Sequence, residues 1–334
     1  MSAAPLEVRE LSKRFPVGTA LRRRSQVHAV DDVSFELHPG TITALVGESG
    51  SGKSTVARLL ARLYLPTDGT VLFEGSDVSR VKRRRDVMRY RSQVQIIFQD
   101  PFDSLNPVKT VRHHVERPLR IHHVVPRSEV KERALELLET VGLVPADEVA
   151  AKYPHELSGG QRQRVAIARV LAVEPRIVLA DEPTSMLDVS IRIGILNLML
   201  KLKEERGLTF LYVTHDLASA RYVADDILVM YAGQIVERGP IEQVLAEPLH
   251  PYTRLLLKAV PDPAKKLHAE RIETRKGHAS AAVDPPEGCR FVQRCPLAID
   301  VCSRVTPLLV EAPRGQSARC HVTAPAPPPA TERT

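Results

Sequence analysis

The stretch Gly47-Glu48-Ser49-Gly50-Ser51-Gly52-Lys53-Ser54-Thr55 decides the fold of this chain. It follows a short apolar run, residues 42–46, and a helical pattern follows it, with apolar residues at Val56, Leu59, Leu60 and Leu63. A strand, a glycine-rich loop and a helix in this order are what a phosphate-binding loop requires. The glycines let backbone N–H groups turn toward a phosphate, and the start of the helix adds partial positive charge. We therefore predict a nucleotide site here rather than an ordinary turn before a helix.

Two side chains of this loop carry specific chemistry. Lys53 can reach the β- and γ-phosphates of a nucleotide, and the Ser54 hydroxyl can ligate Mg²⁺. The loop therefore predicts a site for nucleotide phosphates and Mg²⁺.

The bulk composition is that of an ordinary folded protein. The chain has 334 residues, of which 43% are hydrophobic, and a formal net charge of +7. No apolar run approaches the roughly 20 residues that a membrane span needs, and the first residues lack a secretory pattern, so we expect a cytoplasmic protein. Basic clusters at residues 22–24 and 82–85 could meet nucleic acid or an anionic membrane, but such clusters are more typical of solvated loops.

Polar residues follow three further apolar runs, at the point where each expected strand ends. Gln99 follows residues 94–98, Asp181 and Glu182 follow residues 177–180, and His215 comes shortly after residues 209–213. Such strand ends meet the ligand at one edge of an α/β sheet. We expect Asp181 to contact Mg²⁺ and Glu182 to act as a base that polarises water. Gln99 is either a Mg²⁺ or water contact or a loop hydrogen bond, and His215 either contacts the γ-phosphate or is structural.

A second glycine-containing turn opens a helix in the middle of the chain. Residues Leu157-Ser158-Gly159-Gly160-Gln161 precede a helical pattern over residues 162–173, which is another geometry that can bind an anion. The preceding block, about residues 100–160, contains a predicted helix over 128–141 with Ser128 as its N-cap. It is interpreted as a helical insertion into an α/β core.

All four cysteines lie near the C-terminus, at Cys289, Cys295, Cys302 and Cys320. Their spacing is wider than that of most structural zinc sites, and a disulfide is not expected in a cytoplasmic protein. Four thiolates suit an iron–sulfur cluster or zinc, and four reduced buried thiols are the remaining alternative.

These motifs, in this order and spacing, resemble the ATP-binding subunit of ABC transporters over about the first 260 residues. The resemblance implies a Walker A loop at 47–54 and a signature motif at 157–161. It also implies roles for single residues. Phe15 would be the adenine-stacking aromatic, Gln99 the Q-loop glutamine and Asp181 the Walker B carboxylate. Glu182 would be the catalytic base, Asp188 the D-loop aspartate and His215 the switch histidine. In such proteins two subunits enclose two ATP molecules, and the signature motif of one faces the Walker A loop of the other. One departure is Met186, where a small residue is usual.

Other short motifs resemble the dipeptide/oligopeptide import ATPases more narrowly. They are Gln99–Phe102, Ser104–Pro107, Tyr153–Glu156, His250–Thr253 and the segment from Pro285 to Pro296. This resemblance implies a second, different ATPase subunit, two membrane permeases and an extracytoplasmic solute-binding protein as partners. It places the chain at the cytoplasmic face of the inner membrane. It also implies a 4Fe–4S cluster on the four cysteines.

The expected fold is therefore α/β, a P-loop ATPase with a RecA-like core. Residues 1–260 would form the nucleotide-binding domain, with the helical subdomain at about 100–160. Residues 261–323 would form a small Cys-containing C-terminal domain, and residues 324–334 a disordered tail.

The predicted function is ATP hydrolysis that powers di- or oligopeptide import. Nickel import by the same family is an alternative. A soluble ABC-type ATPase acting on DNA or ribosomes is supported only by the net basic charge, and we expect no nucleic-acid partner. A nucleotide sensor without activity is disfavoured by the pair Asp181 and Glu182.

Overall fold

The computed structural model describes residues 5–17, 25–100, 104–259, 283–285 and 287–324. Its centre is an eight-stranded sheet with the strand order β11-β12-β10-β9-β3-β8-β7-β6. The five strands from β9 to β6 are parallel: β3 (Ile42–Val46), β6 (Val94–Ile97), β7 (Ile177–Asp181), β8 (Thr209–Thr214) and β9 (Asp226–Tyr231). Every residue of β3, β7 and β8 is buried, which explains their nearly continuous apolar sequences.

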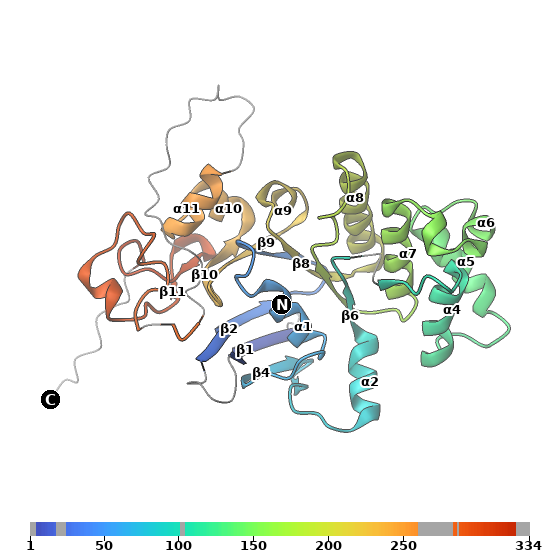
Figure 1. The fold of residues 1–334 in the computed structure, drawn as a ribbon, viewed down its shortest axis with the longest axis horizontal. Coiled ribbons are helices and arrows are strands. Elements are labelled where there is room, and N and C mark those ends of the chain that lie inside the picture. The colour runs from blue at the N-terminus through green and yellow to red at the C-terminus, as the bar shows by residue number, and fades with distance from the viewer. Residues whose placement is uncertain (1–4, 18–24, 101–103, 260–282, 286, 325–334) are drawn as a thin grey trace.

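The C-terminal residues extend this sheet at the edge next to β10 (Gln234–Pro240). Two short strands, β11 (Val310–Glu311) and β12 (Ser317–Ala318), join it by antiparallel pairing of β12 with β10. Figure 1 shows the C-terminal segment beside β10 and helices α10 (Ile241–Ala246) and α11 (Pro251–Lys258). The C-terminal region therefore shares a sheet with the core.

A second, antiparallel sheet lies against the first helix. Its order is β2-β1-β4-β5, from β1 (Leu6–Val17), β2 (Ser25–Leu37), β4 (Asp68–Phe73) and β5 (Ser76–Asp77). Its inward-facing apolar side chains share one buried cluster with the apolar face of α1 (Lys53–Leu60) and with residues of the central sheet. Helix α1 is thus covered by the second sheet, which fixes the loop that precedes it.

The helices between β6 and β7 form the expected insertion. They are α4 (Val111–His122), α5 (Val130–Thr140), α6 (Ala146–Ala151) and α7 (Gly159–Leu171), with a 3₁₀ turn at Pro154–Glu156. They pack on one another at the end of the molecule opposite the C-terminal region (Figure 1). The predicted cap of the second of these helices is wrong. Ser128 lies in a turn, and α5 begins after Glu129, which makes no side-chain cap.

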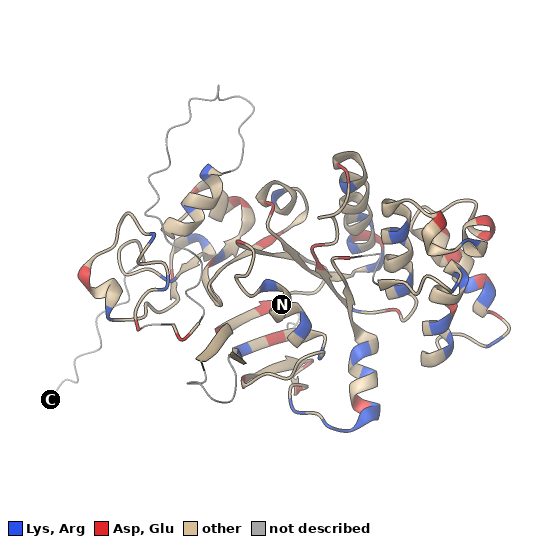
Figure 2. Cartoon of the chain, in the orientation of Figure 1, with Lys and Arg blue, Asp and Glu red and all other residues tan. Residues whose placement is uncertain are grey.

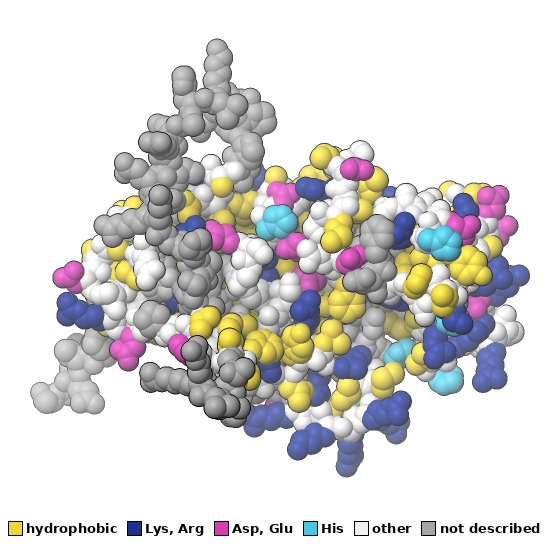
Figure 3. Space-filling model, viewed as in Figure 1, with side chains coloured by type: hydrophobic (Ala, Val, Ile, Leu, Met, Phe, Trp, Pro, Cys, Tyr) yellow, Lys and Arg dark blue, Asp and Glu magenta, His cyan; other side chains and the backbone are white. Residues whose placement is uncertain are grey.

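The remaining helices are α2 (Arg84–Gln93), α8 (Val189–Arg206) and α9 (Leu217–Val223), and 3₁₀ turns occur at Asp300–Ser303 and Pro313–Gly315. Part of the basic cluster at 82–85 is helical rather than loop, because α2 begins at Arg84. Lys and Arg residues are frequent along α2 in Figure 2, and dark-blue side chains cover this end of the molecule in Figure 3, where they face solvent. In the described part of the chain, no helix is both long and apolar enough to cross a membrane.

Three sequence expectations fall outside the described residues. They are the basic cluster at 22–24, the boundary between domains at residues 260 and 261, and most of the tail from 325 onward.

Candidate functional site

The phosphate-binding loop connects β3 to α1 and is shaped by its glycines. A Cβ at Gly47 would lie 2.1 Å from the Met230 carbonyl oxygen, and one at Gly52 would lie 2.1 Å from the Ala29 carbonyl oxygen. Both residues also have positive φ, 156° and 108°. Only glycine fits at these two points, because the backbone carbonyl oxygens of two neighbouring strands occupy the space that a Cβ would need. Gly50, at φ 77°, has open space around its missing Cβ and leaves room for a ligand.

Lys53, the first residue of α1, is folded back into this loop. Its ammonium donates to the carbonyl oxygens of Gly47 at 2.7 Å and Glu48 at 2.8 Å. Only 4% of the residue is exposed. Burial lowers the pKa of Lys53, and the carboxylates of Glu182, Asp181 and Glu48 oppose that shift. The charge is thus held at the loop among acceptors that a phosphate could replace.

Ser54 and Asp181, which lie on different elements, meet beside the loop. The Ser54 hydroxyl donates to Asp181 Oδ1 at 2.8 Å, and Asp181 is 2% exposed at the end of β7. Burial raises the pKa of the Asp181 carboxyl, and the hydrogen bond from Ser54 lowers it to a smaller extent. A hydroxyl and a carboxylate at this distance are the hard oxygen donors that Mg²⁺ prefers.

Glu182 lies at the centre of a second group of side chains. Its carboxylate accepts a hydrogen bond from Gln99 Nε2 at 3.1 Å and lies 3.3 Å from His215 Nδ1. The backbone turns sharply here, because Glu182 has φ 47° and its N–H donates to the Val213 carbonyl oxygen. The ends of β6, β7 and β8 therefore bring together three residues that the sequence placed at one edge.

A small pocket adjoins this group, and several of its residues had not been predicted. It is lined by Glu182, Thr184, Ser185, Arg192, Thr214, His215 and Asp216. Arg192 Nη1 lies 3.5 Å from Asp216 Oδ2, so the pocket wall carries both signs of charge. The sequence signal for Asp216 was its place directly after His215, whereas Arg192 lies on α8 without a recognisable motif.

The second turn, Leu157–Gln161, satisfies its own polar groups. The Ser158 hydroxyl accepts from the Gln161 N–H at 3.2 Å, and Gln161 Oε1 accepts from the Ser158 N–H at 3.0 Å. This is a capping box at the start of α7. Ser158 is exposed. Among the described residues, no hydrogen bond or ion pair joins this turn to Gly47–Thr55.

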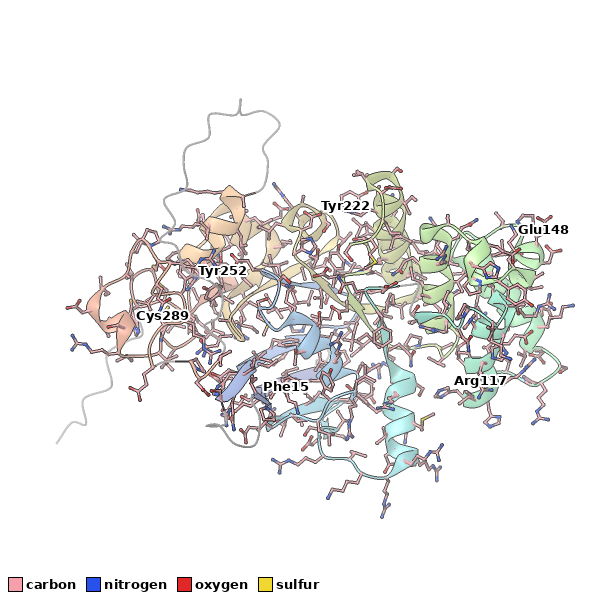
Figure 4. The ribbon with its side chains drawn as sticks, viewed as in Figure 1. Phe15, Arg117, Glu148, Tyr222, Tyr252 and Cys289 are labelled. Atoms are coloured by element: carbon pink, nitrogen blue, oxygen red, sulfur yellow. The ribbon has the colours of Figure 1, made fainter. Side chains whose placement is uncertain are left out.

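The other two predicted positions are Asp188 and Phe15. Asp188 is exposed at the N-cap of α8, and its side chain makes no cap hydrogen bond. Phe15 lies on β1, edge-on to Tyr64 at 5.6 Å between ring centroids, with the Lys13 ammonium 5.1 Å above its ring. Figure 4 labels Phe15 on the antiparallel sheet.

The four cysteines come together in the C-terminal region. All are free thiols, and Cys295, Cys302 and Cys320 are buried. The Cys289 N–H donates to the Cys302 carbonyl oxygen at 2.7 Å. Burial raises the pKa of the Cys289 thiol to about 11, and the other three cysteines add to the shift. In the part of the chain that the structure describes, no three His, Cys, Asp or Glu side chains are arranged to hold a metal ion.

Two residues hold the phosphate-binding loop from outside and were not assigned to the site from the sequence. The Tyr252 hydroxyl accepts from the Glu48 N–H at 2.8 Å. Arg294 donates to both carboxylate oxygens of Glu48, each at 2.8 Å. Tyr252 belongs to the motif His250–Thr253, which had marked only a family resemblance, and no local pattern marks Arg294.

Comparisons with protein families agree with the motif order. Residues 30–185 match the family model described as ABC transporter, and residues 236–302 match the model described as oligopeptide/dipeptide transporter, C-terminal region. The second match begins before the expected domain boundary at residue 260.

Individual relatives match nearly the whole chain. A protein of Sinorhizobium fredii, described as a probable peptide ABC transporter ATP-binding protein, is 44% identical over 98% of this chain and 92% of its own length. The oligopeptide transport ATP-binding protein AppF of Bacillus subtilis is 44% identical over 95% of this chain and 97% of its own length.

Solved structures match the ATPase core. An ATP-binding cassette solved as a dimer in a post-hydrolysis state with ADP and Pi has a TM-score of 0.63 and 32% identity, and covers 71% of this chain and 98% of its own. The cbiO1 protein of Clostridium perfringens has a TM-score of 0.64 and 30% identity, and it covers 74% of this chain and 92% of its own. The fold, the loop geometry and these relatives together show that the chain belongs to the ATP-binding subunits of the ABC transporter family, in the branch that carries the oligopeptide/dipeptide transporter C-terminal region.

Proposed function

We propose that this protein is the ATP-hydrolysing subunit of an importer that carries di- or oligopeptides across the cytoplasmic membrane. The observation that carries the proposal is the convergence of two groups beside the phosphate-binding loop: Ser54 with Asp181, and Glu182 with Gln99 and His215. The names of the relatives support peptides as the cargo.

The phosphate-binding loop would hold the nucleotide. Backbone N–H groups at the start of α1 would donate to the phosphates, and the Lys53 ammonium would exchange the carbonyl oxygens of Gly47 and Glu48 for the β- and γ-phosphates. Phe15 stacks on the adenine. Ser54, Asp181 and Gln99 would hold Mg²⁺, and the ion would neutralise charge on the phosphates.

Glu182 is the general base of the hydrolysis. Its carboxylate orients the attacking water in line with the γ-phosphate and accepts the proton. His215 donates a hydrogen bond to the γ-phosphate, and its contact with Glu182 keeps both groups at the same edge of the sheet. Lys53 and His215 then stabilise the charge that develops as the bond to the leaving group lengthens.

The turn Leu157–Gln161 contacts the ATP bound by a second ATPase subunit, and Asp188 lies in the same interface. The exposure of Ser158 and Asp188 supports this role. The second subunit is a different chain, so the pair is a heterodimer. Its closure is passed through the helices α4 to α6 to two membrane permeases, which receive peptide from an extracytoplasmic binding protein. The subunit is thus peripheral at the cytoplasmic face of the inner membrane.

The four cysteines hold a 4Fe–4S cluster with a structural role. Their number and closeness support Cys₄ ligation. The cluster would hold together a C-terminal domain of residues 261–323. Anaerobically purified protein should contain four iron atoms per chain; iron-free protein would refute the cluster, and stoichiometric zinc would establish the alternative.

Uptake by cells lacking only this gene tests the proposed function. Labelled dipeptides, longer peptides and nickel ions are offered separately, and the wild-type gene is returned on a plasmid. Loss of peptide uptake that the plasmid restores supports the proposal. Loss of nickel uptake alone would move the protein to the nickel-import branch, and no loss of either in a strain without a second peptide importer would contradict both.

A further inference from the structure

One residue of the phosphate-binding loop is held from three directions. The Glu48 side chain is bound by Arg294, its N–H donates to the Tyr252 hydroxyl at 2.8 Å, and its carbonyl oxygen accepts from Lys53 at 2.8 Å. Arg294 lies in the cysteine-containing region, 246 residues further along the chain. Figure 4 labels Tyr252 and Cys289, which lie at the same end of the molecule.

The contact between Arg294 and Glu48 is built for fixed geometry. The guanidinium binds both carboxylate oxygens, each at 2.8 Å, and the two side chains are 14% and 33% exposed. Such a two-pronged ion pair fixes direction as well as distance. The hydrogen bond from Arg294 to Glu48 also raises the pKa of the guanidinium, which keeps it charged.

Aromatic packing holds Arg294 itself in place. Its guanidinium carbon lies 5.7 Å from the ring centroid of Tyr231 and 5.8 Å from that of Phe291. Phe291 is 2% exposed and packs edge-on to Tyr231 at 5.2 Å. Tyr252 completes the group at 5.6 Å from Phe291. This packing holds the arginine in the orientation in which it binds Glu48.

We propose that Arg294 is a positioning residue of the ATP site: through Glu48 it fixes the phosphate-binding loop in the conformation that accepts the nucleotide phosphates. The inference rests on the proposed function, since it concerns the same site. The C-terminal region would thereby set the affinity of the loop for ATP, although none of its residues touches the nucleotide.

The C-terminal region has other attachments that do not involve the loop. Strand β12 pairs with β10, and the Arg319 guanidinium lies 3.3 Å from Asp32 Oδ2. Arg314 pairs with Glu247 at 3.1 Å, with both side chains exposed. Losing Arg294 should therefore leave the region attached, so an effect on the loop can be separated from an effect on the fold.

The test measures the dissociation constant of MgATP for the purified full-length chain. We expect Arg294→Gln and Glu48→Gln each to weaken binding about 10-fold, the loss of one charged hydrogen-bond pair. The double variant should be no weaker than either single variant, because both remove the same contact. Arg294→Lys should recover part of the affinity. Arg314→Gln, which breaks the remote pair, should bind like wild type.

The steady-state rates of the assembled pair separate positioning from catalysis, since the KM for ATP should rise in both variants while kcat is retained. If Arg294→Gln fails to fold, Glu48→Gln breaks the same pair from the other side, away from the cysteines. Wild-type affinity in Glu48→Gln, or a lower unfolding midpoint of Arg294→Gln with unchanged affinity, would overturn the inference alone. A wild-type chain that does not bind MgATP would overturn the proposed function and the inference together.

Discussion

The loop Gly47–Thr55 and the turn Leu157–Gln161 both place glycines at the start of a helix, but their surroundings differ. The loop is enclosed: its lysine is 4% exposed, and strands press on Gly47 and Gly52. The turn is open, with Ser158 exposed, and its polar side chains satisfy each other in a capping box. A similar sequence thus produces two different structures. The loop holds a buried lysine against backbone carbonyl oxygens that phosphates could replace, whereas the turn is a helix start whose side chains satisfy each other.

This difference explains why we propose different roles for the loop and the turn. The loop has charge, metal ligands and a base beside it within one chain, so it can hold a whole nucleotide. The turn has a helix N-terminus and an exposed serine, but its Ser158 hydroxyl already accepts from the Gln161 N–H, and Arg162 next to it donates to the Leu157 carbonyl oxygen. It can add contacts to a phosphate that another subunit already holds, and the following variants test that distinction.

Lys53→Ala should have the largest effect on binding. Removing the ammonium deletes hydrogen bonds to the phosphates, each worth about 1.5–3 kcal/mol when one partner is charged. MgATP affinity of the isolated chain should fall about 10- to 100-fold, as measured by equilibrium binding. Lys201→Ala, which removes an exposed lysine of α8, is the control. Undiminished affinity in Lys53→Ala would mean that the loop is not the nucleotide site.

Ser158→Ala should affect hydrolysis without affecting binding by the isolated chain. We expect an unchanged MgATP dissociation constant and a fall of about 10-fold in ATP hydrolysis by the assembled pair. Loss of the cap should cost about 1 kcal/mol in the free energy of unfolding.

Thr110→Ala is the matched control for Ser158→Ala. It removes the N-cap of α4, whose hydroxyl accepts from the His113 N–H, and should cost comparable stability without lowering hydrolysis. Weaker ATP binding by isolated Ser158→Ala would show that the turn acts within its own chain, contrary to the proposal.

Acid should lower the free energy of unfolding through His250. Burial lowers the pKa of this histidine to about 3 from the ordinary 6.5. Because the folded state resists the proton that the unfolded chain takes up, stability is full above pH 6.5 and is lost as the pH falls below it, by up to about 1.4 kcal/mol per pH unit. Arg254 adds to the lowering. The buried Glu237 carboxyl, whose pKa burial raises, acts in the opposite sense at lower pH.

His250→Asn isolates this effect. The His250 ring accepts from the Tyr252 N–H as the cap of α11, and asparagine can take over that cap. Chemical unfolding at several values between pH 6.5 and 5 should show a falling stability in wild type and a flatter profile in the variant. Equal slopes in the two proteins would contradict the assignment.

The residues along single elements were predictable, and those joining distant segments were not. The apolar runs before Gly47, Gln99, Asp181 and Thr214 read as buried strands, so their polar ends could be placed at one edge from the residue pattern alone. The prediction that Gln99, Glu182 and His215 gather there is matched by their contacts.

Other features carried no local signal. Strand β12 has two residues, too few for any periodicity, and its partner β10 lies about 80 residues earlier. The pair Arg294 and Glu48 joins residues 246 positions apart in the sequence, so no local pattern could indicate it. The cap at Ser128 was mispredicted because a serine before an apolar stripe is only a local preference, and the chain makes a turn from Pro126 to Glu129 first.

The measurement that tests the account most directly is made on Glu182→Gln. The amide keeps the size of the side chain but cannot act as a base, so ATP hydrolysis should fall about 100-fold or more while MgATP binding is retained. In cells lacking the gene, this variant should fail to restore peptide uptake that wild type restores. Normal steady-state hydrolysis by Glu182→Gln, or uptake equal to wild type, would contradict the claim that hydrolysis at Glu182 powers import.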